Sequence, residues 1–243
     1  MPYSVGGVML LYKRMVAGVL AIVLTGCSVF SDGYSTTIKK EEQETEYSSV
    51  YAEIIEFGGF KNKEYQSELN LSIQKEVEDA ISAFDALASE ASEALPKGVK
   101  SSLYITQNVK RNTTDMVSFI TEVYTYTGGA HGNTVWVPHT INVISENPHN
   151  LSLGELFRDK DYMKKLNVII ERMVTENPDK YSELWQKPEI TKENEDRFYM
   201  TDNELVIFFP PYELSYYAKG FIEFPIPISE LNPILNEEFK QTK

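Results

Sequence analysis

The residues best suited to chemistry gather in one short stretch of the sequence. Residues 123–134 read Val-Tyr-Thr-Tyr-Thr-Gly-Gly-Ala-His-Gly-Asn-Thr, so a histidine stands among three glycines. A histidine in an exposed loop titrates near neutral pH and can act as a general acid or base. Such catalysis also needs a positioned partner, and no nucleophile motif precedes His131. We therefore expect His131 to hydrogen-bond the backbone and to fix the shape of the loop.

The three histidines do not form a known metal-binding motif. His131, His139 and His149 are spaced by eight and ten residues, which matches neither HxxxH nor HExxH. The sequence also contains no GxSxG, GxxxxGK(S/T) or GxGxxG motif, so it supports neither a hydrolase nucleophile elbow nor a nucleotide-binding loop. We expect no metal, no cofactor and no catalytic residue.

The glycine loop is also a candidate recognition surface. Gly128, Gly129 and Gly132 mark positions where the backbone turns sharply or is closely approached, because glycine alone adopts positive φ without steric cost. Short glycine loops expose backbone N–H groups that can donate to a ligand. The three glycines and His131 are therefore predicted ligand-binding residues.

A second candidate surface is an aromatic and proline-rich run near the end of the chain. Eight such residues fall between positions 208 and 221, and the whole chain contains 15 tyrosines. Tyrosine combines apolar area with a hydroxyl group, which suits protein interfaces and stacking on sugar rings. We expect Phe208 and Phe221 to fill a core, and acidic neighbours such as Glu213 to attract a basic protein. The predicted surface residues are Pro211, Tyr212, Tyr216 and Tyr217.

Periodic patterns indicate the elements that position the glycine loop. Residues 101–109, 116–127 and 135–143 alternate polar with apolar side chains, which predicts three sequential antiparallel strands with the loop between the last two. Apolar residues recur every three or four positions over 63–93, which predicts a long helix that covers one face of this meander. Another strand precedes the helix and ends at Gly58-Gly59.

A second unit is predicted after Pro148. A turn at 151–157 leads to an amphipathic helix over 161–176. Three short strands follow at 197–200, 205–209 and 221–228, and residues 229–239 predict a terminal helix. Pro225 and Pro227 confine the last strand to a sheet edge. The expected fold is α+β, with two packed sub-domains of antiparallel sheet and helices on one face.

The N-terminal residues indicate export. Lys13 and Arg14 precede an apolar run and the sequence Leu24-Thr25-Gly26-Cys27, an order typical of a secretory signal peptide. The last four residues resemble a bacterial lipobox. That resemblance implies a lipid on Cys27, which would hold the protein on the cell membrane, facing outside the cytoplasm. An uncleaved anchor with an incidental cysteine is the alternative.

Composition completes the expected domain plan. Residues 1–26 are the predicted signal peptide, and residues 27–46, rich in Ser, Thr, Lys and Glu, predict a flexible tether. The two sub-domains are expected at 47–147 and 148–243. The formal net charge of −13 opposes binding to nucleic acid and favours a cationic partner. The same charge could also serve only to keep an exported protein soluble.

Four motifs in order resemble a known family: residues 126–134, residues 151–157, residues 198–201 with 205–212, and residues 224–231. The chain resembles the extracellular domains of RsiV-type anti-sigma factors and the accessory domains of PdaC-type peptidoglycan deacetylases. This resemblance implies an exported α+β module, PdaC-type in the first sub-domain and RsiV-type in the second, which in the anti-sigma factors binds lysozyme.

The sequence also departs from both relatives. About 14 residues precede the apolar segment, which is too few for a sigma-binding region, so we expect neither a sigma-binding region nor a deacetylase domain. We therefore expect a non-enzymatic lipoprotein that binds a protein, with a lysozyme-like cationic protein as the first candidate, or a cell-wall glycan. An envelope enzyme acting on peptidoglycan is the alternative, and a purely structural envelope protein is a third possibility.

Overall fold

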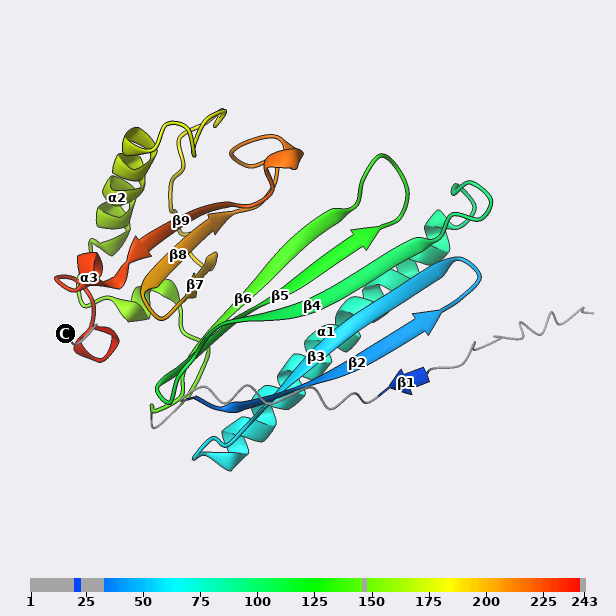
Figure 1. Cartoon of the computed structure of the whole chain (residues 1–243), viewed down its shortest axis with the longest axis horizontal. Helices are drawn as coiled ribbons and strands as arrows, with labels where there is room; N and C mark the ends of the chain where they lie inside the picture. The colour runs from blue at the N-terminus through cyan, green and yellow to red at the C-terminus, as the bar shows by residue number, and fades with distance from the viewer. Residues whose placement is uncertain (1–19, 23–32, 146–147, 241–243) are drawn as a thin grey trace, which may run out of the picture.

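The computed structural model describes residues 20–22, 33–145 and 148–240. The strands of its larger sheet are β1 (Leu20–Ile22), β2 (Ser35–Glu44), β3 (Ser48–Gly58), β4 (Ser101–Asn112), β5 (Met116–Tyr126) and β6 (Asn133–Asn142), in that spatial order (Figure 1). A smaller sheet contains β7 (Phe198–Met200), β8 (Glu204–Phe209) and β9 (Ile222–Pro227). The expected α+β fold is confirmed.

Helix α1 (Lys63–Ala91) covers one face of the larger sheet. Its buried side chains follow a spacing of three and four residues, because that spacing places them on one side of a helix. They are Leu69, Ile73, Val77, Ile81, Phe84 and Ala88. Since α1 carries the chain back across the sheet, β3 and β4 pair in parallel, whereas β4, β5 and β6 form the expected antiparallel meander.

The expected flexible tether over residues 27–46 is wrong for residues 35–44, which form strand β2. Residues 35–44 were expected to be flexible because they are polar and charged, yet they pair with β3 over ten consecutive positions. A strand near a sheet edge gains main-chain hydrogen bonds and tolerates charged side chains, so it needs little apolar surface. Two ion pairs, Lys39 with Glu56 and Lys40 with Glu53, join the two strands.

The second unit has its own core. Helix α2 (Tyr162–Glu176) buries Leu166 and Ile170 against the smaller sheet, in which β9 is an edge strand, as its two prolines predicted. The predicted terminal helix over 229–239 is wrong. Instead, α3 (Ile228–Leu231) ends before Pro233, and a separate 3-10 turn spans Glu237–Phe239. Proline lacks the N–H group that a continuing helix would need.

The two units pack together on the face of the larger sheet opposite to α1. Ile120 of β5 joins Tyr199, Val206 and Phe208 of the smaller sheet in one buried cluster. The backbone N–H of Met200 donates to Ser118 Oγ across the interface at 3.1 Å. The end of the glycine loop is thereby brought to the same side of the molecule as the segment that follows β8 (Figure 1).

Cys27, the predicted lipidation site, lies outside the described residues. Within the ranges that the structure describes, no helix combines the length and the apolar character needed to cross a bilayer.

Candidate functional site

The glycine loop between β5 and β6 has the geometry that its glycines predicted. Gly128 and Gly129 adopt φ values of 114° and 91°, which side chains with a Cβ rarely adopt. Gly132 is buried, and a Cβ there would lie 2.5 Å from Cζ of Tyr124. It would also lie 2.6 Å from the backbone carbonyl oxygen of Thr125, which cannot move aside as a side chain can, so position 132 requires glycine.

His131 stands exposed at the end of this loop and contacts both units. Its Nδ1 lies 2.7 Å from the carbonyl oxygen of Gly132, which can only accept, so Nδ1 carries a proton and donates. Its Nε2 lies 3.0 Å from Tyr212 Oη. The imidazole also stacks on the ring of Tyr217, with a centroid separation of 3.8 Å and an interplanar angle of 14°. The expected hydrogen bond from His131 to the backbone is thus present.

The segment after β8 brings its tyrosines to this loop in a strained conformation. Tyr212 has φ 68°, a left-handed value that is costly for a bulky residue, and its side chain is 56% exposed. Its ring centroid lies 5.6 Å from that of Tyr217. Such strain persists where surrounding contacts hold it, and it concentrates at functional sites.

Glu183, in the loop that follows α2, holds Tyr216 in place. Its carboxylate accepts from Tyr216 Oη at 2.8 Å and pairs with Lys219 at 2.9 Å. The hydrogen bond from Lys219, and after it the one from Tyr216, lower the pKa of Glu183. The hydrogen bond to Glu183 in turn raises the pKa of Tyr216. Glu183 also has φ 68°. We did not predict Glu183, because it lies in a charged stretch with no local motif.

We call His131, Tyr212 and Tyr217, whose rings contact one another, the aromatic junction. The predicted surface residue Tyr216 lies in the same segment and binds Glu183 instead. The structure brings together the two groups of predicted residues, the glycine loop and the aromatic run. They meet at His131 and Tyr212, which are 81 positions apart in the sequence. Gly128, Gly129 and Gly132 shape one side of the junction, and the partly buried Pro211 belongs to the other. Phe208 is buried, as expected. Phe221 stacks on Trp136 of β6 at 3.8 Å, so it supports the interface between the units.

The expected role of Glu213 needs correction. Its carboxylate pairs with Arg197, so its charge is largely compensated. Its backbone carbonyl accepts from the indole N–H of Trp185 at 2.9 Å. Glu213 therefore holds the segment in place and adds little net field at the junction.

The other two histidines have separate partners. His139 Nε2 lies 3.2 Å from a carboxylate oxygen of Glu76 on α1, and its ring stacks on Phe119. His149 Nε2 lies 2.7 Å from Glu155. In the described parts of the chain, no group of three or more histidine, cysteine, aspartate or glutamate side chains is placed to hold a metal ion.

Two family models match the chain one after the other. Residues 38–134 match the model described as Deacetylase PdaC, and residues 154–229 match DUF3298, a protein family of unknown function. Two proteins of Bacillus subtilis (strain 168) are similar to most of the chain. The peptidoglycan-N-acetylmuramic acid deacetylase PdaC is 26% identical over 184 residues, which cover 74% of this chain and 38% of PdaC. The anti-sigma-V factor RsiV is 25% identical over 202 residues, which cover 80% of this chain and 68% of RsiV.

This chain resembles PdaC-type and RsiV-type proteins. It spans less than half the length of PdaC. Two crystal structures share the fold. A DUF3298 family protein from Pseudomonas aeruginosa PAO1 superposes with a TM-score of 0.63 at 15% identity, over 87% of this chain and 99% of that one. A DUF3298 family member from Bacteroides fragilis NCTC 9343 gives a TM-score of 0.61 at 14% identity, over 86% and 96%.

Proposed function

We propose that this chain is a non-enzymatic binding module of the bacterial cell envelope whose aromatic junction contacts a protein or cell-wall glycan ligand. Similarity to RsiV and to PdaC supports a sensor or accessory module of the envelope. The resemblance to RsiV-type proteins makes a lysozyme-like cationic protein the first candidate. A lipid on Cys27 would hold the module at the outer side of the membrane.

The observation that carries this proposal is the convergence of three rings from two sub-domains. His131 comes from the loop between β5 and β6, and Tyr212 and Tyr217 come from the segment between β8 and β9 of the smaller sheet. Tyrosines that are held rigidly and remain partly exposed supply contact area at low entropic cost. Both ring nitrogens of His131 are held by the Gly132 carbonyl and the Tyr212 hydroxyl, an arrangement that suits a rigid contact surface.

The charge of the molecule favours a basic ligand at long range. The chain has a net charge of −13, while Glu183 and Glu213 at the junction are already paired with Lys219 and Arg197. The attraction would therefore come from the overall field of the protein, which raises the association rate and weakens with salt.

A titration of the purified protein with hen lysozyme, at low and at physiological salt, tests the proposal. We expect micromolar or tighter binding that weakens as salt is added. Absence of binding at micromolar concentrations in both buffers would refute the proposal that the ligand is a lysozyme-like protein. Because β2 belongs to the sheet, any soluble fragment must begin before Ser35.

Membrane attachment has its own test. Cells that express the protein would be labelled with radioactive palmitate and fractionated. We expect label on the wild-type protein in the membrane fraction, and no label on Cys27→Ser. Equal labelling of the two proteins would refute lipidation at Cys27.

A further inference from the structure

A second aromatic surface lies on the larger sheet, and Tyr124 at one end of it packs against Gly132 of the glycine loop. Tyr51 of β3, Tyr104 of β4 and Tyr124 of β5 stand side by side in register across three adjacent strands. Their ring centroids are separated by 6.4 Å and 6.1 Å. Neighbouring residues on the strands, such as Val50 and Leu103, point instead into the core beneath α1. We call these three tyrosines the tyrosine row.

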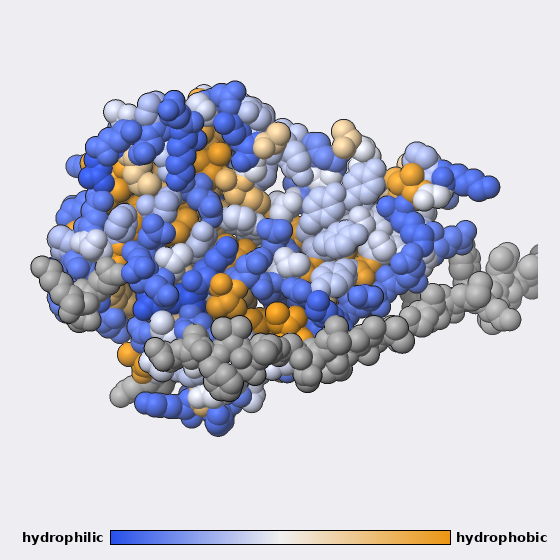
Figure 2. Space-filling model, in the orientation of Figure 1, coloured by the Kyte–Doolittle hydropathy of each residue, from blue (hydrophilic) through white to orange (hydrophobic). Residues whose placement is uncertain are grey.

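The row is partly open to solvent. Tyr104 is 49% exposed, although its strand lies in the middle of the sheet, and Tyr51 and Tyr124 on either side of it are half-buried. In Figure 2, pale side chains of intermediate hydropathy gather over β3 to β5, on the face that α1 does not cover. Exposed aromatic side chains on adjacent strands form a continuous contact surface, and such surfaces mark binding sites more often than isolated residues do.

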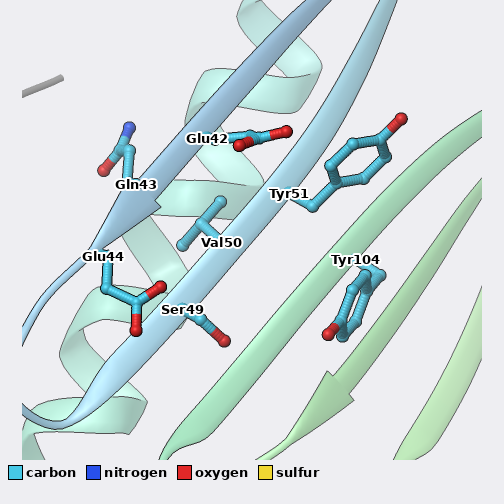
Figure 3. A pocket seen from close by; sticks show the side chains of 7 residues that line it. All are labelled: Glu42, Gln43, Glu44, Ser49, Val50, Tyr51 and Tyr104. Atoms are coloured by element: carbon cyan, nitrogen blue, oxygen red, sulfur yellow. The ribbon is translucent and has the colours of Figure 1, made fainter. Parts of the chain in front are cut away.

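One end of the row opens into a hollow of about 310 Å³ at the β2 side of the sheet. Figure 3 shows Tyr51 and Tyr104 projecting to the same side, with Glu42 extending from β2 towards Tyr51. Ser49 and Glu44 also line the hollow. The site therefore combines flat aromatic rings with a few hydroxyl and carboxylate groups, which is the usual composition of a small-ligand site.

Most charges around the row are compensated. Lys40 pairs with Glu53 at 3.5 Å, and Lys100 pairs with Glu44 at 2.6 Å. Tyr51 Oη donates to Glu53 at 2.7 Å. Within the described ranges the carboxylate of Glu42 makes no hydrogen bond or ion pair, so it is available to accept from a ligand hydroxyl.

The position of Lys40 argues against a cationic ligand. Its ammonium nitrogen lies 5.4 Å from the ring centroid of Tyr51, so a cation already occupies the electron-rich face of that ring. A basic side chain arriving there would meet the like charge of Lys40. A ligand without charge meets no such repulsion.

We propose that the tyrosine row and Glu42 form a binding site for an uncharged oligosaccharide. The rings stack against the C–H faces of sugar units, and the carboxylate of Glu42 and the hydroxyl of Ser49 hydrogen-bond to sugar hydroxyls. The row crosses three strands, so it accommodates a chain of sugars better than a single sugar. This inference rests on the proposed role as a binding module, but it concerns other residues than the aromatic junction, which the row meets only where Tyr124 packs against Gly132.

Calorimetric titration with chitotetraose, cellotetraose and tetralysine tests this site in the purified protein. We expect millimolar or tighter binding of at least one tetrasaccharide and no binding of tetralysine. Tyr104→Ala should weaken sugar binding about tenfold or more, whereas Tyr104→Phe should retain it because the ring remains. Leu71→Ala, which removes an exposed side chain from α1, is the matched control and should leave binding unchanged.

The outcomes separate this inference from the proposed function. If neither tetrasaccharide binds at millimolar concentration, or if tetralysine binds instead, the site is not a glycan site. Equal sugar affinity of Tyr104→Ala and the wild type would also overturn it. Lysozyme binding by Tyr104→Ala reports separately on the aromatic junction, because Tyr104 is not part of that surface.

Discussion

His131 Nε2 and Tyr212 Oη lie 3.0 Å apart, although 81 residues separate them in the sequence. This contact joins the loop between β5 and β6 to the segment after β8. Because each partner belongs to a different unit, the arrangement of the aromatic junction depends on the packing between the two sheets. A ligand that covers both residues would therefore report on, and stabilise, that packing.

The backbone of Tyr212 provides a test of the junction geometry. Since Tyr212 has φ 68°, a glycine there relieves strain that an alanine retains. We expect Tyr212→Gly to be more stable than Tyr212→Ala by about 1 kcal/mol. Urea unfolding of the two variants measures the difference. A more stable alanine variant would mean that residue 212 does not adopt positive φ.

Ser118 tests the interface between the units. Its buried hydroxyl accepts from the backbone N–H of Met200 at 3.1 Å and lies 2.8 Å from Thr140 Oγ1. Ser118→Ala leaves these groups without that partner, so we expect a loss of about 1–3 kcal/mol of unfolding free energy. Ser67→Ala, at an exposed serine on α1, should change it by less than about 0.5 kcal/mol. Equal stabilities of the two variants would argue against this interface.

Two residues of α2 form a matched pair for the core of the second unit. Leu166 is fully buried, and Val168 is 61% exposed on the same helix. We expect Leu166→Ala to reduce the free energy of unfolding by about 2–5 kcal/mol, because it removes buried apolar atoms and leaves a cavity. Val168→Ala should cost less than about 0.5 kcal/mol. Thermal and chemical unfolding would check both values. A small loss of stability in Leu166→Ala would contradict the packing of α2 against the smaller sheet.

Glu155, in the short 3-10 helix Leu153–Leu156, should make the stability of the protein depend on pH. Glu155 accepts from Ser152 Oγ and from the Ser152 backbone N–H, and these bonds, with that of His149, lower the pKa of Glu155 to about 2. A carboxyl group with a depressed folded-state pKa stabilises the protein above its unfolded-state pKa, and this contribution is lost as the pH falls towards 2. The side chain is partly exposed, so solvent screening reduces the effect.

Comparison of the wild type with Glu155→Gln isolates this contribution. We expect the stability difference between them to be largest above about pH 5 and to shrink as the pH falls towards 2. A difference that stays constant over this range, measured by urea unfolding at each pH, would contradict the assignment.

Much of the fold could be predicted from periodicity. The spacing of Leu69, Ile73, Val77, Ile81 and Phe84 identified α1, and alternation identified the meander β4 to β6. Strand β2 escaped prediction because main-chain pairing stabilises it and its side chains are polar. The parallel pairing of β3 with β4 also has no local signature, since it follows from where α1 returns the chain.

The site was predicted in parts and not as a whole. Glycine and tyrosine identified the two halves of the aromatic junction from residue type alone, but no sequence pattern places His131 beside Tyr212. The tyrosine row illustrates the same limit. Tyr51, Tyr104 and Tyr124 are widely separated in sequence, and only strand register brings them together.

The central claim is that the aromatic junction binds the ligand. The most direct test is to measure the dissociation constant of the lysozyme complex for Tyr212→Gly and for the wild type. Glycine keeps the positive φ and removes the exposed ring, and Val168→Ala serves as the control on a distant surface. If the aromatic junction binds the ligand, Tyr212→Gly binds about tenfold or more weakly, while Val168→Ala binds like the wild type. Equal dissociation constants for all three proteins would contradict the account.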